Sequence, residues 1–175
     1  NMNHDNSMRK LTIITTGGTI EKTYDEIEGS LHNRETIIRQ RIKEGLRLPY
    51  TEIDVKSIMA KDSLDMTEED RKIILNSIQE HAVNGQPIVV LHGTDTMQQT
   101  AELVFNEYKD PKVPIVFTGA MKPLGFIDSD AVQNVVEAMM VAKILVPGVY
   151  ISFHNRLFHV PGVQKNKALR TFETF

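Results

Sequence analysis

The sequence contains no cysteine, which excludes disulfide bridges, thiolate metal sites and a cysteine nucleophile. No apolar run approaches the ~20 residues of a membrane-spanning helix, and the polar residues 1–6 lack the hydrophobic region of a signal peptide. The net charge is only −3, so nothing electrostatic favours nucleic acid as the main partner. We therefore expect a cytoplasmic protein whose partners are neither membranes nor nucleic acids.

The length and composition are those of an ordinary globular domain. The chain has 175 residues, of which 41% are hydrophobic and 25% are charged. This length allows one domain with a sizeable core, whereas two full domains would be cramped. We expect a flexible N-terminal tail over residues 1–10 and a single α/β domain over residues 11–175.

Short β-branched runs alternate along the chain with segments of helical spacing. Strands are expected at residues 11–14, 53–59, 88–91, 115–117 and 149–153. Helices are expected at residues 35–44, from the N-cap Thr67 to Gly85, at 97–108 and at 131–145. This alternation predicts a three-layer αβα fold with a mainly parallel, flavodoxin- or Rossmann-like sheet. Residues 21–33 are expected to form a long mobile loop, and the basic tail after Pro161-Gly162 has no obvious regular partner.

The most informative segment is a polar run that directly follows the first expected strand. In Thr16-Gly17-Gly18-Thr19, the glycines allow close approach of the backbone to a ligand. Exposed amides there could hold an oxyanion, and a threonine could attack a substrate if a base removed its proton. A simple tight turn or a phosphate-binding loop is the alternative, although the run is neither a G-x-G-x-x-G motif nor a P-loop.

A second polar run, His92 to Met97, follows another buried strand. Its Thr94 stands beside Asp95, whose carboxylate can bind an ammonium group. The alternative is structural, because Asp95 or Thr96 could instead cap the next helix. Two more strand ends carry hydroxyl and glycine residues, in Asp62-Ser63-Leu64-Asp65-Met66 and in Thr118-Gly119-Ala120-Met121-Lys122-Pro123. Loops at the carboxyl ends of strands form the ligand crevice of open α/β sheets, so a shared site is expected.

Other polar residues carry weaker signals. His92, His154 and His159 lack an H-E-x-x-H pattern or paired carboxylates, so no metal site is expected. A Ser63–His92–Asp95 relay is disfavoured because neighbours at one strand end need not face each other.

The four runs together resemble the bacterial-type L-asparaginase family, in the same order and over most of the chain. The family hydrolyses the side-chain amide of asparagine, and to varying degrees that of glutamine, without a cofactor. The resemblance implies that Thr16 is the nucleophile that forms an acyl-enzyme and that Tyr24 helps to activate it. It pairs Thr94 and Asp95 with Lys165, with Lys167 as the fallback.

The resemblance also implies how the substrate is held. Ser63 and Asp95 would bind the α-carboxylate and α-amino groups, backbone amides beside Gly17 and Thr94 would form the oxyanion hole, and the Ala120 carbonyl would orient the leaving amide. The implied catalytic set is Thr16, Tyr24, Thr94, Asp95 and Lys165. The implied substrate-binding set is Gly17, Ser63, Leu64, Thr94, Asp95 and Ala120.

The chain departs from the family pattern in two ways. Larger members carry a second, smaller C-terminal domain, and this chain resembles a subgroup of short single-domain asparaginases. Leu64 stands where larger members often carry a glutamine that touches the substrate carboxylate. Both differences imply weaker substrate binding and a more open site. A homodimer or higher homo-oligomer that packs helix faces such as residues 135–142 could cover that site.

Two other functions remain open. The chain could be the amidase component of an amidotransferase, whose ammonia passes to a partner enzyme. It could also be a non-catalytic, asparaginase-like module that senses an amino acid. The Met139-Met140 pair, by contrast, is expected only to fill the core.

Overall fold

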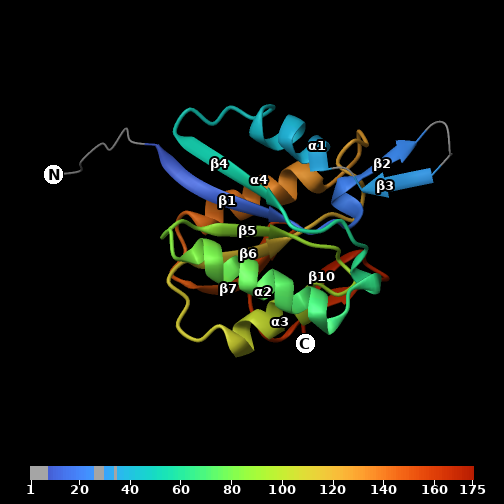
Figure 1. Cartoon of the computed structure of the whole chain (residues 1–175). Coiled ribbons are helices and arrows are strands. Elements are labelled where there is room, and N and C mark those ends of the chain that lie inside the picture. Colours follow the sequence, from blue (N-terminus) through green and yellow to red (C-terminus); the bar gives the residue numbers. More distant parts are fainter. Residues whose placement is uncertain (1–7, 26–29, 34) are drawn as a thin grey trace.

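The computed structural model describes residues 8–25, 30–33 and 35–175. Among these residues a six-stranded sheet forms the centre, in the order β4-β1-β5-β6-β7-β8 (Figure 1). Its strands are β1 (Arg9–Thr15), β4 (Thr51–Ser57), β5 (Ile88–Leu91), β6 (Pro114–Thr118), β7 (Gly148–Phe153) and β8 (Arg156–His159). Neighbouring strands from β4 to β7 are parallel, and β8 joins β7 antiparallel. The mainly parallel sheet is therefore confirmed.

Helices cover both faces of the sheet, which confirms the three-layer αβα architecture (Figure 1). The helices are α1 (Glu35–Ile38) with the π-helical turn η2 (Arg39–Lys43), α2 (Glu68–Ala82), α3 (Met97–Glu107) and α4 (Ala131–Ala142). One hydrophobic cluster joins α2 and α3 to the sheet, and a second joins α1, η2 and α4 to the opposite face. Strand β5 is buried throughout, as a strand covered on both faces must be.

Helix α2 begins as its sequence indicates. The Thr67 hydroxyl accepts a hydrogen bond from the Asp70 N–H at 3.2 Å, and the Asp70 carboxylate accepts one from the Thr67 N–H at 2.9 Å. This reciprocal capping box satisfies N–H groups that the first helical turn leaves unpaired. None of the described helices is long and apolar enough to cross a lipid bilayer.

The strand order identifies the place where a ligand can bind. Numbered by their order along the chain, the parallel strands follow the sequence 2-1-3-4-5 across the sheet, which is the flavodoxin-like order. The order reverses between β1 and β5. Folds of this type bind ligands beyond the carboxyl ends of the strands at that reversal.

The N-terminal part of the chain differs from the prediction in two respects. Strand β1 begins at Arg9, so Arg9 and Lys10 belong to the sheet rather than to the expected tail, while residues 1–7 lie outside the described part. The expected irregular loop over residues 21–33 contains a 3-10 turn, η1 (Thr19–Glu21), and the antiparallel strands β2 (Lys22–Asp25) and β3 (Ser30–Asn33). These strands are short and polar, so they lack the apolar alternation by which a sequence indicates a strand.

The C-terminal tail also has regular structure that the sequence did not predict. Strands β9 (Val163–Asn166) and β10 (Thr171–Thr174) form an antiparallel hairpin in which Lys165 pairs with Phe172. Val163 and Phe172 are buried in the same core cluster as α2 and α3. One buried residue in each strand anchors the hairpin, which is too sparse a pattern to be recognised as periodic.

Candidate active site

The two polar loops that contain Thr16 and Thr94 meet at the reversal of strand order. The first follows β1 and the second follows β5, and these strands are parallel neighbours with Thr15 beside Leu91. The topology therefore brings together two segments that lie far apart in the sequence. The 3-10 turn η3 (Ser63–Asp65), which follows β4 on the other side of β1, joins them.

Glycine allows these loops to touch backbone to backbone. A Cβ atom added to Gly18 would lie 2.7 Å from the Cα of Gly93, and one added to Gly93 would lie 2.8 Å from the Cβ of Ser63. Gly18 also has a φ of +88°, a conformation that side chains rarely adopt. Gly18 and Gly93 therefore allow the three loops to pack closely together.

A cavity of about 190 Å³ opens where the three loops meet. It is lined by Gly18, Thr19, Lys22, Asp62, Ser63, Leu64, Asp65, Gly93, Thr94 and Asp95. Pockets for drug-sized ligands measure roughly 300–1,000 Å³, so this cavity suits a smaller molecule. A larger groove of about 640 Å³ lies between β4 and α2, but none of the predicted site residues lines it.

Thr94, Asp95 and Lys165 form one hydrogen-bonded set. The Lys165 ammonium nitrogen donates to the Thr94 hydroxyl at 2.7 Å and to the Asp95 carboxylate at 2.9 Å. The Lys165 side chain is only 15% exposed, whereas Lys167 is exposed to solvent. Between the two candidate lysines, the geometry therefore favours Lys165. A hydroxyl, an amine and a carboxylate in contact can exchange a proton at the edge of the cavity.

The structural alternative for this second loop, helix capping, is not observed. Thr96 is the N-cap of α3, but its side chain makes no capping bond. Its hydroxyl instead donates to the Ser63 carbonyl at 3.0 Å, and its N–H donates to the Ser63 hydroxyl at 3.2 Å. These two bonds tie η3 to the second loop, and the Asp95 carboxylate is left for Lys165 and the cavity.

Thr16 lies deeper than the sequence implies. Its side chain is fully buried, and its hydroxyl donates to the Leu91 carbonyl at 2.8 Å. The neighbouring Gly17 N–H donates to the buried Glu21 carboxylate at 3.1 Å. Neither Thr16 nor Gly17 is among the residues that line the cavity. Sequence reasoning missed Glu21, which looked like part of a solvated polar loop.

The remaining predicted residues lie around these loops. Ser63 lines the cavity and is buried, while Leu64 stands at its rim and is 72% exposed. Ala120 follows β6 and is buried outside the cavity lining. Tyr24 belongs to β2, where its backbone pairs with Leu31, and its side chain lies outside the described part of the structure.

His92 is a neutral support for the second loop rather than a member of a relay. Burial lowers its pKa to about 4. Its Nδ1 lies 2.8 Å from the Gly93 carbonyl, which only accepts, so Nδ1 carries the proton. Its Nε2 then accepts a hydrogen bond from the Thr100 hydroxyl at 2.8 Å. Both ring nitrogens are thus engaged away from Ser63 and Asp95.

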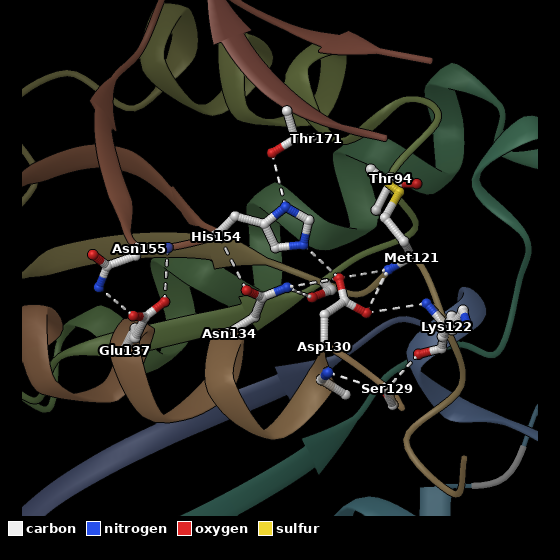
Figure 2. Close-up of polar contacts among 12 residues, drawn as sticks. Thr94, Met121, Lys122, Ser129, Asp130, Asn134, Glu137, His154, Asn155 and Thr171 are labelled. Carbon is white, nitrogen blue, oxygen red and sulfur yellow. Dashed lines mark hydrogen bonds and ion pairs between the residues drawn. The ribbon is translucent and has the colours of Figure 1, made fainter. Parts of the chain in front are cut away.

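A second polar network, centred on Asp130 and His154, was not anticipated (Figure 2). The Asp130 carboxylate accepts hydrogen bonds from the N–H groups of Met121 and Lys122 at 3.0 and 3.1 Å and lies 2.7 Å from His154 Nε2. Burial raises the pKa of Asp130, but the hydrogen bonds from the Met121 N–H, His154 and backbone N–H groups including that of Lys122 together outweigh burial, so the net pKa is lowered. A spaced Asp and His carry no motif, so only the folded chain reveals their contact.

Comparisons with known proteins show which family the chain resembles over most of its length. The family model of the asparaginase N-terminal domain matches residues 10–175. An L-asparaginase of Thermococcus kodakarensis is 29% identical over 91% of this chain and 48% of its own length. The solved structure of the thermostable enzyme from that organism superposes with a TM-score of 0.85, covering 95% of this chain and 51% of that one.

Two further relatives widen the range of functions. A component of the glutamyl-tRNA(Gln) amidotransferase of Methanococcus vannielii is 28% identical over 90% of this chain and 37% of its own length. A solved structure of a probable cytoplasmic L-asparaginase of Campylobacter jejuni is 25% identical, has a TM-score of 0.77, and is matched over 95% of this chain and 51% of that one. The chain thus spans about half of these asparaginases and less of the amidotransferase component.

Proposed function

The chain belongs to the asparaginase family, and on that premise we propose that it hydrolyses L-asparagine to L-aspartate and ammonia, with weak activity on glutamine. The observation that carries the proposal is the contact of one lysine, Lys165, with both the Thr94 hydroxyl and the Asp95 carboxylate. An amide is a poor electrophile with a poor leaving group, so its hydrolysis needs such a proton relay beside a nucleophile.

In the proposed mechanism, the Thr16 oxygen attacks the side-chain amide carbon. For this the hydroxyl must leave the Leu91 carbonyl to which it is bonded at 2.8 Å. Its proton reaches the amide nitrogen, the carbon–nitrogen bond breaks, and ammonia leaves an ester on Thr16. Water then adds to the ester carbon, and its proton returns to Thr16 as aspartate departs. Tyr24 assists the first attack.

Thr94, Asp95 and Lys165 move protons in both steps. A lysine that gives up its proton can accept one from the Thr94 hydroxyl, and the Asp95 carboxylate stabilises the ammonium form that results. The Thr94 N–H would stabilise the oxyanion, while the Gly17 N–H can do so only after it leaves Glu21. The proposed steps use no metal or organic cofactor.

The cavity lining indicates how a zwitterionic amino acid would bind. Asp95 offers a carboxylate to the α-amino group, and Ser63 offers a hydroxyl to the α-carboxylate. Lys22 also lines the cavity, where it forms an ion pair with Asp62 at 2.8 Å. The Ala120 carbonyl would orient the leaving amide, and Leu64 would form an open rim.

Ammonia release from free asparagine is the test. The isolated chain should release ammonia and aspartate in equal amounts, and Thr16→Ala should abolish the release. Release that persists in this variant would remove Thr16 from the mechanism. If the wild-type chain released nothing over a wide range of asparagine concentrations, the proposal that it hydrolyses asparagine would fail, and binding of asparagine without any release would favour an amino-acid-sensing module.

The alternative is the amidase component of an amidotransferase, and the similarity to the Methanococcus vannielii protein supports it. Such a component would prefer glutamine and would depend on a partner enzyme for activity. A chain that is inactive alone on both amino acids, but that becomes active on glutamine with such a partner, would favour this alternative.

We also propose that the chain acts in the cytoplasm as a homodimer or a higher homo-oligomer. The prediction that the helix face of residues 135–142 forms the subunit contact is partly wrong, because Val135 and Met139 are buried in the core. Val136 and Met140 of α4 are exposed beside Leu157 and line an apolar groove of about 410 Å³. Light scattering that finds a monomer at assay concentration would contradict this proposal.

A further inference from the structure

The hairpin that carries Lys165 is not a part of the central sheet. Strands β9 and β10 form a separate two-stranded sheet, so no ladder of backbone hydrogen bonds fixes them against β5 and the Thr94 loop. Phe172 docks the hairpin by edge-on contact with Phe153, with ring centroids 4.8 Å apart. Apolar contact is not directional. Besides the bonds of Lys165 itself to Thr94 and Asp95, a directional bond at another point of the hairpin would help to hold the geometry of this contact.

His154 supplies that bond. Its Nδ1 lies 2.8 Å from the hydroxyl of Thr171, the first residue of β10, which pairs with Asn166 next to Lys165. Its Nε2 lies 2.7 Å from the Asp130 carboxylate, which only accepts, so Nε2 carries a proton. In the neutral ring, Nδ1 accepts a hydrogen bond from Thr171.

The backbone of His154 has an uncommon conformation, with the ring placed between Thr171 and Asp130. Its φ is +47°, a value that is uncommon for residues other than glycine. Its N–H donates to the Asn134 side-chain oxygen at 3.1 Å, which ties the turn to α4. Strain of this kind persists where the surroundings over-determine the conformation.

The other end of the network holds the loop that contains Ala120. Asp130 accepts hydrogen bonds from the Met121 and Lys122 N–H groups, and the Asn134 amide donates to the Gly119 carbonyl at 2.9 Å (Figure 2). Three backbone groups that flank Ala120 are thus held by Asn134 of α4 and by Asp130, the residue that precedes this helix. The order Thr171–His154–Asp130 looks like a hydrolytic triad, but neither Thr171 nor His154 is among the residues that line the cavity.

We propose that His154 is a positioning residue. It holds the hairpin that carries Lys165 (residues 163–174) and the loop that contains Ala120 (residues 119–122) in fixed positions relative to each other. The inference rests on the proposed function, in which Lys165 moves protons and Ala120 orients the leaving amide. His154 is not among the residues that line the cavity, and its ring nitrogens bond to Thr171 and Asp130, so it would act through Thr171 on one side and Asp130 on the other. The loss of either bond should let Lys165 or Ala120 shift from its position, which lowers kcat, rather than weaken substrate binding.

The test compares Thr171→Val with Thr171→Ser, which differ by the hydroxyl that His154 binds. Thr171→Val should lower kcat for asparagine about 5- to 30-fold with KM changed less than about twofold, because small displacements of catalytic groups are costly. Thr171→Ser should stay within about twofold of wild type. Glu137→Ala is the matched control, since the Glu137 carboxylate accepts the Asn155 N–H at 2.9 Å on the same turn but outside the network.

His154→Asn extends the test, because asparagine tolerates a positive φ but is too short to reach both partners. Hydrogen exchange should quicken over residues 163–174 and 119–122 in this variant, and over 163–174 in Thr171→Val. A wild-type kcat in Thr171→Val, or an equal loss in Thr171→Ser, would overturn the inference. A wild-type chain without activity would instead refute the proposed function, and unchanged exchange in His154→Asn would then refute the positioning role separately.

Discussion

The loops after β1 and β5 are built alike, yet their two threonines stand in different chemical environments. The Thr16 hydroxyl donates to the Leu91 carbonyl, which can orient it but cannot accept its proton. The Thr94 hydroxyl contacts Lys165, whose amine can exchange a proton. Both loops follow a buried β-branched strand, and both contain glycine and threonine. The difference arises from a residue 71 positions away, so a local motif locates a polar loop but does not reveal which distant side chain contacts its hydroxyl.

The largest expected effect comes from removing either hydroxyl. Thr16→Val and Thr94→Val should each lower kcat by at least ~10³-fold, because the two hydroxyls act in the same reaction sequence. For groups that act as a unit, the double variant should be about as slow as the slower single variant. Steady-state ammonia release measures all three. Losses that multiply in the double variant would mean that the two loops work independently.

Removing the Lys165 amine is the next test of the difference between the environments of Thr16 and Thr94. Lys165→Met should lower kcat by about 10²- to 10⁴-fold, the usual contribution of a positioned proton donor or acceptor. Lys167→Met is the matched control, because Lys167 lies on the same hairpin but is exposed. Its kcat should stay within about twofold of wild type. Equal effects of the two substitutions would remove the basis for placing the base at the second loop.

Much of the fold could be predicted because its elements carry local signals. The buried run of β5 and the capping box of Thr67 and Asp70 each indicate their own structure. The strand-end loops could be located as well, since strand order alone brings Thr16 and Thr94 to one edge of the sheet. Such features depend on a few neighbouring residues, which a sequence displays directly.

The unpredicted features depend on contacts between distant residues. The hairpin of β9 and β10 has one buried side chain in each strand, so its stability comes from contacts with the core rather than from a pattern of its own. The bond between His154 and Asp130 spans 24 positions without a motif. Glu21 is likewise buried, with its carboxylate accepting the Gly17 N–H, although the neighbouring charges in the sequence suggested exposure to solvent. Sequence reasoning therefore found the loops and missed what supports them.

A third prediction concerns the histidine beneath the second loop, whereas the buried titratable group beside the first loop is a carboxylate, that of Glu21. Burial holds the pKa of His92 at about 4, below its ordinary 6.5, so it is neutral in the folded chain. As the pH falls from about 6.5 toward 4, the unfolded chain takes up a proton that the folded chain does not. The free energy of unfolding should therefore decrease with falling pH, by up to about 3 kcal/mol from this group.

Urea unfolding at pH 7.5 and pH 5 measures this effect. At these values most carboxylates remain ionised, so the decrease is dominated by histidine. His92→Gln cannot titrate, and its loss of stability between the two pH values should be smaller than that of the wild type by about 2 kcal/mol. An identical pH dependence in wild type and variant would show that His92 does not carry the effect.

The smallest expected effect tests the contact between the two loops. Gly18→Ala and Gly85→Ala both place a Cβ at positive φ, +88° and +74°, and at Gly18 the ψ of −179° adds to the strain because that region is essentially restricted to glycine. At Gly85 the added atom meets nothing within 4 Å, whereas at Gly18 it meets the Gly93 backbone at 2.7 Å. Gly18→Ala should therefore lower the free energy of unfolding by about 2 kcal/mol more than Gly85→Ala.

Activity separates the two glycine variants further, because the added Cβ at Gly18 would push apart the loops that carry Thr16 and Thr94. Gly18→Ala should lose kcat even at temperatures where it remains folded, while Gly85→Ala should keep it. Thermal unfolding and ammonia release on the same samples provide both measurements. Equal stability and equal activity in the two variants would mean that the loops tolerate separation, and the close contact of Gly18 with Gly93 would then have no part in bringing the two threonines to one site.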